Sequence, residues 1–114
     1  MTNVVETHGR ITRFPGDSVV LPGKTKVFTC CSDIQKTIFW KQKSVRSPST
    51  KDINDLFGLV NGFRSGRFNV TPDNSPGCYS LVTENVTLGD EGTYSCTDEA
   101  GLGHSRTWEL TILG

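Results

Sequence analysis

Apolar and polar residues alternate over several short stretches of this chain. The alternation is clear at residues 27–31, 38–43, 79–83, 94–96 and 108–112. A period of two places successive side chains on opposite faces of a β-strand, whereas no window of about twelve residues has the apolar spacing of an amphipathic helix. Runs rich in glycine, proline, aspartate and asparagine separate the stretches. The pattern predicts an all-β sandwich or barrel, in which a facing sheet covers the apolar side of each strand.

Two segments bear on the edges and the core of that sandwich. Trp108, Leu110 and Ile112 share one face of the last stretch, which predicts that Trp108 lies in the core. A β-bulge in this strand would instead expose Trp108 as an interface anchor. Residues 44–65 are the least regular part of the chain, and residues 55–60 within them are expected to form a short edge strand.

Length and charge narrow the possible partners. The 114 residues are expected to form a single domain, residues 1–114. Twelve Lys and Arg residues balance twelve Asp and Glu residues, so the chain lacks the positive surplus that binds nucleic acid or an anionic membrane. No apolar run approaches the roughly 18 residues that span a bilayer. We therefore expect no nucleic-acid partner and no membrane insertion by this segment.

The cysteines indicate the compartment. The chain contains four of them, Cys30, Cys31, Cys78 and Cys96. Zinc sites bring close pairs of Cys and His together, and this spacing is absent here. An even number of cysteines without metal-site spacing favours disulfides and an oxidising compartment. Asn69 and Asn85 each begin an Asn-X-Thr sequon, which predicts glycosylation at both and an extracellular location.

A catalytic site is not expected. The two histidines are His8, near the terminus, and His104, which follows the last cysteine by eight residues. Nothing in the sequence places a serine, a free thiolate or a carboxylate beside either of them. No phosphate-binding loop and no metal-ligand spacing occur. We therefore expect neither catalysis nor a cofactor or metal.

One series of aromatic and cysteine residues has a specific spacing. Trp40 comes ten residues after Cys30, and Tyr94 lies two residues before Cys96. The run Asp-Glu-Gly-Thr-Tyr-Ser-Cys, which ends at Cys96, looks like the D-x-G-x-Y-x-C segment of the immunoglobulin superfamily. Residues 66–70 are similar to the Gly-Arg-Phe opening of strand D in its variable-type domains. The chain therefore resembles that family along nearly its whole length.

The resemblance implies a fold. It implies an immunoglobulin V-type Greek-key β-sandwich of two antiparallel sheets, with a Cys30–Cys96 disulfide between the sheets and Trp40 packed on it. It also implies an ion pair between Arg67 and Asp90, which closes one end of the sandwich and is structural. The 27 residues from Trp40 to Arg67 leave room for extra edge strands. That spacing favours a variable-type (V-set) domain over the shorter I-set.

The other two cysteines are expected to face outward. Cys31 follows the inward Cys30, and Cys78 precedes the inward Tyr79, so both should point away from the core. Their strands, B and E in the family, are neighbours, which predicts a Cys31–Cys78 disulfide. Two free thiols are one alternative, and the use of Cys31 in place of Cys30 as the partner of Cys96 is another.

The resemblance also implies a function class. It indicates the extracellular recognition domain of an innate immune-type receptor, which binds a protein or other ligand without catalysis. One alternative is a cell-adhesion domain that pairs with itself or a relative through the GFCC′ sheet, which is the sheet made of the family's strands G, F, C and C′. Another alternative is a spacer within a longer ectodomain. A relative of V–J antigen receptors is a further alternative, because Gly101 and Gly103 form a Gly-X-Gly run five residues after Cys96.

Candidate binding residues follow from the family's use of the outer GFCC′ face and of the loops at one end. In this chain strand C carries Trp40 and strand F carries Cys96. The outward residues of these two strands are Phe39, Lys41, Lys43, Thr93, Ser95 and Thr97. The loops at residues 32–36 and 97–104 add Asp33, Asp98, Glu99 and His104. Phe39 is expected to anchor an interface, since aromatic residues are favoured there. Cover by the segment around Leu56 and Phe57 is the alternative. Glycans on Asn69 and Asn85 would leave the GFCC′ face clear for a protein partner or a second copy.

Overall fold

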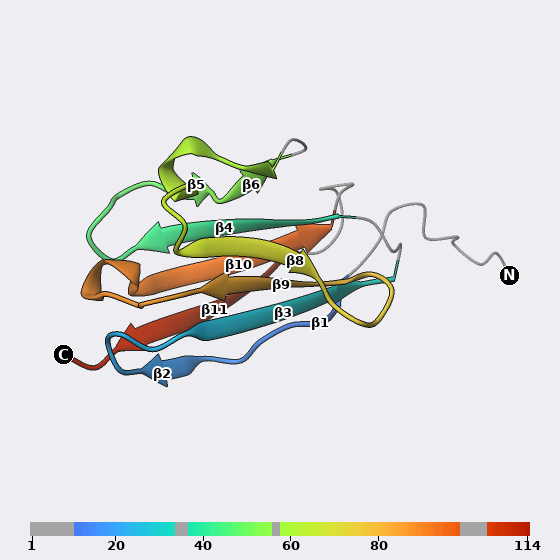
Figure 1. The fold of residues 1–114 in the computed structure, drawn as a ribbon. Coiled ribbons are helices and arrows are strands. Elements are labelled where there is room, and N and C mark those ends of the chain that lie inside the picture. The colour runs from blue at the N-terminus through green and yellow to red at the C-terminus, as the bar shows by residue number, and fades with distance from the viewer. Residues whose placement is uncertain (1–10, 34–36, 56–57, 99–104) are drawn as a thin grey trace, which may run out of the picture.

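The computed structural model describes residues 11–33, 37–55, 58–98 and 105–114 as two packed sheets (Figure 1). The four-stranded sheet has the order β1 (Ile11–Arg13), β3 (Lys26–Ser32), β9 (Cys78–Thr83) and β8 (Phe68–Pro72). The five-stranded sheet has the order β2 (Ser18–Val20), β11 (Ser105–Ile112), β10 (Gly92–Asp98), β4 (Ile38–Ser44) and β5 (Lys51–Asp52). All pairs are antiparallel except β2 with β11. The predicted β-sandwich is confirmed.

Four aromatic rings fill the space between the sheets. The ring centroid of Phe28 lies 5.2 Å from that of Tyr94 and 5.3 Å from that of Trp108. Trp40 meets Trp108 edge to face at 5.9 Å. Such tilted arrangements stabilise a core beyond the area that they bury. Trp108 is 2% exposed, so the prediction that it lies in the core is confirmed and β11 does not expose it as an interface anchor.

Consecutive cysteines of β3 form disulfides in different directions. Cys30 points into the core and joins Cys96 of β10, so this bond links the two sheets. Cys31 points to the other face of β3 and joins Cys78, its register partner on β9, within one sheet. Both expected pairs are therefore present, and the alternatives with free thiols or an exchanged partner are not. A closed loop of 66 residues restricts the unfolded chain and is worth about 4 kcal/mol on the chain-entropy account.

The irregular stretch folds differently from the expected edge strand. It contains β6 (Asn54–Asp55) and β7 (Gly58–Leu59), which pair only with each other, followed by the 3₁₀ helix η1 (Asn61–Phe63). At β6 the side chain of Asn54, and not the strand backbone, forms the hydrogen bonds to β4. β6 therefore does not extend the five-stranded sheet. Asn54 accepts a hydrogen bond from the Trp40 amide at 2.7 Å and donates one to the Ile38 carbonyl at 3.0 Å. Among the described residues, the strand that pairs with the free edge of β4 is β5, which is two residues long.

Gly92 explains one position of the Asp-Glu-Gly-Thr-Tyr-Ser-Cys run. It begins β10 at the point where this strand meets the end of β4, and its φ is +156°. A Cβ atom there would collide with the carbonyl oxygen of Lys43 and lie 2.8 Å from the Cα of Ser44. Because both neighbours are backbone atoms, they cannot move aside easily. The close approach of β4 to β10 therefore requires glycine.

Candidate protein-binding face

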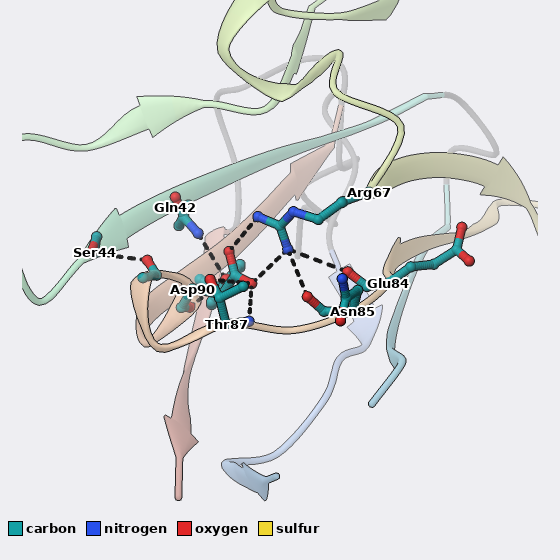
Figure 2. Close-up of polar contacts among 9 residues, drawn as sticks. Gln42, Ser44, Arg67, Glu84, Asn85, Thr87 and Asp90 are labelled. Carbon is teal, nitrogen blue, oxygen red and sulfur yellow. Dashed lines mark hydrogen bonds and ion pairs between the residues drawn. The ribbon is translucent and has the colours of Figure 1, made fainter. Parts of the chain in front are cut away.

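The polar residues around Arg67, at one end of the sandwich, hold the fold together. Arg67 binds Asp90 through two parallel hydrogen bonds of 2.9 and 3.1 Å (Figure 2). Asp90 also accepts a hydrogen bond of 2.8 Å from the backbone amide of Thr87, at the start of the 3₁₀ helix η2 (Leu88–Asp90). The Arg67 guanidinium reaches the carbonyls of Glu84 and Asn85 at 3.3 Å as well. These residues join β8 to the turn before β10.

Tyr94 extends this arrangement into the core. Its hydroxyl donates a hydrogen bond of 2.6 Å to the carbonyl of Asp90 and accepts one of 2.8 Å from the amide of Gln42. Burial raises the pKa of the Tyr94 hydroxyl well above its ordinary value of 10, and the Asp90 charge adds to the effect. The hydrogen bond to Asp90 raises the pKa of the Arg67 guanidinium. We call Gln42, Arg67, Thr87, Asp90 and Tyr94 the Arg67 network.

The outer face of the five-stranded sheet is open to solvent, unlike the Arg67 network. Strand register arranges its side chains in three rows. One row is Lys43, Thr93 and Glu109; the next is Asp52, Lys41, Ser95 and Thr107; the third is Phe39, Thr97 and Ser105. Hydroxyl groups thus fill the centre of the face, with lysines on the β4 side and an acidic residue on the β11 side. We call these rows the outer face.

The residues of β4 and β10 that were predicted to face outward all belong to the outer face. Phe39 is half-buried, and Lys41 and Lys43 are exposed. Thr93, Ser95 and Thr97 are half-buried, because the neighbouring strands β4 and β11 flank them. Leu56 and Phe57, expected as an alternative cover for Phe39, lie outside the described residues.

Two polar contacts on the outer face join side chains of register partners. The Thr93 hydroxyl donates a hydrogen bond of 2.7 Å to the Glu109 carboxylate. The Lys41 ammonium lies 3.7 Å from the Asp52 carboxylate, and both side chains are largely exposed. An exposed ion pair of this length contributes little to folding, so these charges are available to a partner.

The expected loop site is partly wrong. Asp98 was expected in a ligand-binding loop, but it is the last residue of β10 and is 0% exposed. The alternation that turns Tyr94 and Cys96 inward also turns Asp98 inward, so its carboxylate does not reach a ligand from this face. Thr97, at the start of the expected loop, lies on β10 and faces outward, as predicted for a residue of strand F. Glu99 and His104 lie outside the described residues.

The other predicted loop begins one residue later than expected, because β3 extends through Ser32. Ser32 ends β3 and is 3% exposed, whereas Asp33 follows it in an exposed turn. Residues 34–36 lie outside the described residues. Of the charged loop residues that were predicted, Asp33 is the one that the described ranges place at the surface.

Sequence reasoning missed the contribution of β11 to the outer face and the exposed strand β2 beside it. Thr107 and Glu109 are exposed and lie beside Ser95 and Thr93. Val19 of β2 is 61% exposed and is paired with Thr111. The signal was present, because the alternation that places Trp108, Leu110 and Ile112 inward also places the intervening residues outward.

The two sequons lie away from the outer face. Asn69 is exposed on β8, the edge strand of the four-stranded sheet, and Asn85 is exposed in the turn after β9. Among the described residues, no helix has the length and apolar character needed to cross a membrane. In the same ranges, no group of three or more His, Cys, Asp or Glu side chains is arranged to hold a metal ion.

The sheet order, the Cys30–Cys96 disulfide with Trp40 beside it and the Tyr94 hydrogen bond define an immunoglobulin β-sandwich. The crystal structure of the RIG-5 IG1 homodimer is similar, with a TM-score of 0.74 and 20% sequence identity over 93% of this chain and 98% of that one. In all, 1857 chains of solved structures match, so the fold alone selects no partner. No family model and no curated protein matches the sequence.

Proposed function

We propose that this chain is an extracellular, variable-type immunoglobulin domain of an innate immune-type receptor, which binds a protein partner through the outer face without catalysis. The observation that carries the proposal is the outer face itself, a continuous surface over β11, β10, β4 and β5 that holds neither sequon. Two disulfides support an oxidising, extracellular compartment. The edge strand β5, which adds to β4, supports the variable-type assignment.

The chemistry of the outer face favours a transient complex. Stable obligate interfaces have an apolar centre, whereas hydroxyl groups occupy the centre here. Phe39 is the one aromatic residue among the rows of the outer face, and it is flanked by Thr97. A half-buried aromatic ring loses little side-chain entropy on binding, and the polar contacts around it exclude water from the buried ring. We therefore expect Phe39 to carry the largest share of the binding energy.

The test compares one change on the outer face with a matched change on the opposite sheet. Tetramers of the domain are used to stain panels of cells that express candidate ectodomains, with wild type, Phe39→Asp and Val27→Asp. Val27 is 48% exposed on β3, so Val27→Asp introduces the same charge on the outer surface of the other sheet. Staining should be lost with Phe39→Asp and kept with Val27→Asp. Equal staining by the two variants would contradict the proposed face.

Self-pairing through the outer face is the second candidate, as in an adhesion domain. The similar RIG-5 IG1 domain forms a homodimer. The charges of the outer face are also self-complementary, because Lys43 and Glu109 lie on opposite sides of Thr93 in one row. A two-fold axis parallel to β10 would place Lys43 of each copy over Glu109 of the other.

Charge reversal tests the self-pairing. Sedimentation equilibrium over a wide concentration range is measured for wild type, Lys43→Glu, Glu109→Lys and the double variant. Each single variant should weaken the dimer because it creates like charges across the axis. The double variant should restore dimerisation, as should a mixture of the two single variants. A wild type that stays monomeric at every concentration rules out self-pairing and leaves the heterologous partner.

A further inference from the structure

A hollow opens beside one of the two sequons. It has a volume of about 300 Å³ and lies between the β6–β7 hairpin and the neighbouring strands β8 and β9. The residues that line it are Thr37, Asn54, Asp55, Gly58, Leu59, Asn69, Val70, Pro72 and Tyr79. Its wall is therefore made by the edge of the four-stranded sheet and by the hairpin that does not join the five-stranded sheet.

The lining of this hollow is apolar with a few polar groups at its margin. Leu59, Val70 and Tyr79 are half-buried and also pack against the core, so the floor is fixed by the fold. Thr37 contributes a hydroxyl, whereas the Asn54 amide is already bound to the β4 backbone. Sites of this composition take small ligands that have one apolar side and a few hydrogen-bonding groups. An N-acetylated sugar has this character, with a methyl group and ring C–H groups beside hydroxyls.

We propose that the first N-acetylglucosamine of a glycan on Asn69 rests in this hollow. Asn69 is exposed, lines the hollow and begins an Asn-X-Thr sequon that ends at Thr71. In the attachment reaction the Asn69 amide nitrogen loses a proton and bonds to C1 of the sugar, and the polyprenyl diphosphate of the lipid-linked donor leaves. The attached sugar then covers the apolar residues at the open edge between β8 and the hairpin.

Covalent attachment makes a weak contact sufficient. A tethered sugar has a high effective concentration at a nearby surface, so it occupies a shallow hollow that the free sugar would not fill. Burial of the exposed parts of Leu59, Val70 and Tyr79 then favours the docked position. The glycan on Asn69 thereby acts as part of the sandwich edge as well as a surface modification.

Asn85 provides a matched control within the same chain. It is also exposed and also begins a sequon, but it lies in a turn with φ of +50° and does not line the hollow. Its backbone carbonyl accepts a hydrogen bond from Arg67, so the backbone at this position is fixed by the Arg67 network. A glycan on Asn85 should therefore point into solvent. The comparison of the two sites separates a docked sugar from the general effect of glycosylation.

The test uses the whole chain secreted from cultured animal cells, with each glycan trimmed by an endoglycosidase to a single N-acetylglucosamine. Wild type, Asn69→Gln, Thr71→Ala and Asn85→Gln are compared. Loss of the sugar at Asn69, by either substitution, should lower the Tm by about 3 °C, whereas loss at Asn85 should leave it unchanged. Nuclear Overhauser effects should join the acetyl methyl group to the Tyr79 ring and the Leu59 methyl groups.

Two results would overturn the inference. One is peptide mapping that finds Asn69 unmodified in the secreted chain. The other is a modified Asn69 whose acetyl group shows no Overhauser effect to Leu59 or Tyr79, whatever the Tm. This inference and the proposed function share one requirement, which is that the chain enters the secretory pathway. The Phe39→Asp staining result therefore does not depend on either of these two results.

Discussion

The Arg67 network and the outer face use similar polar residues for different tasks. Asp90 is 5% exposed in its side chain and is held to Arg67 by two short hydrogen bonds. Asp52 is 61% exposed and lies 3.7 Å from a single nitrogen of Lys41. A buried carboxylate has to be fully hydrogen-bonded, whereas an exposed one is already satisfied by water. Burial and the number of partners therefore distinguish the structural region from the one that is open to a partner.

The largest effect is expected from Asp90→Ala. The substitution removes both hydrogen bonds to Arg67 and the bond from the Thr87 amide, and it leaves the guanidinium without its carboxylate. Removal of one partner from a largely buried pair costs about 3 kcal/mol. Urea unfolding followed by tryptophan fluorescence measures the change in the free energy of unfolding.

Asp52→Ala is the control for that experiment. It removes the same type of charge from an exposed pair, so the change should be below about 0.5 kcal/mol. Similar losses for the two variants would show that burial does not distinguish the Arg67 network from the outer face.

A smaller loss is expected from Tyr94→Phe. The ring and its packing on Phe28 stay, but the hydroxyl that bonds the Asp90 carbonyl and the Gln42 amide is removed. Gln42 is buried, so its amide is left without this partner and the loss should be about 1–2 kcal/mol. The same urea titration measures it. The further change Gln42→Leu in the Tyr94→Phe background should recover part of the loss, and failure to do so would point to packing as the cause.

Alkaline pH tests the burial of the Tyr94 hydroxyl without removing any packed side chain. Because burial raises the pKa of Tyr94, the folded chain keeps the hydroxyl proton at pH values where the unfolded chain has lost it. The contribution to stability is complete below about pH 10 and falls as the pH rises from there toward the raised pKa, by at most about 1.4 kcal/mol per pH unit. Unfolding of wild type and Tyr94→Phe between pH 8 and 11, as a rough range, isolates this residue. Equal slopes above pH 10 would contradict the assignment.

Much of the fold follows from local sequence signals. Alternation places Cys30 inward and Cys31 outward, and the run that ends at Cys96 indicates the turn, the Asp90 carboxylate and the Tyr94 hydroxyl together. The outer face follows from the same alternation on β4 and β10. Asp98 was predicted in a loop because the alternation was not continued past Cys96. Continued by two residues, the same alternation places Asp98 in the core.

Other features depend on contacts between segments that no local pattern joins. Asn54 binds the backbone of Ile38 and Trp40, which lie 16 and 14 residues away, and nothing near Asn54 distinguishes it from a turn residue. The hollow beside Asn69 is bounded by the β6–β7 hairpin, and these two hydrogen bonds fix the position of that hairpin against β4. A sequon is visible in the sequence, but the surface beside it depends on the folded chain.

The smallest effect on stability is expected at the centre of the outer face. Ser95 and Thr107 are register partners on β10 and β11, half-buried and exposed respectively, and water replaces the bonds of exposed hydroxyls readily. The double variant Ser95→Ala, Thr107→Ala should change the free energy of unfolding by less than about 0.5 kcal/mol. Cell staining by the same tetramers should nevertheless fall, because the partner loses two hydrogen-bonding groups at the centre of its contact. A loss of stability above about 1 kcal/mol would show that these hydroxyls hold the sheet together, as the Arg67 network does, and would remove the basis for treating the outer face as a binding surface.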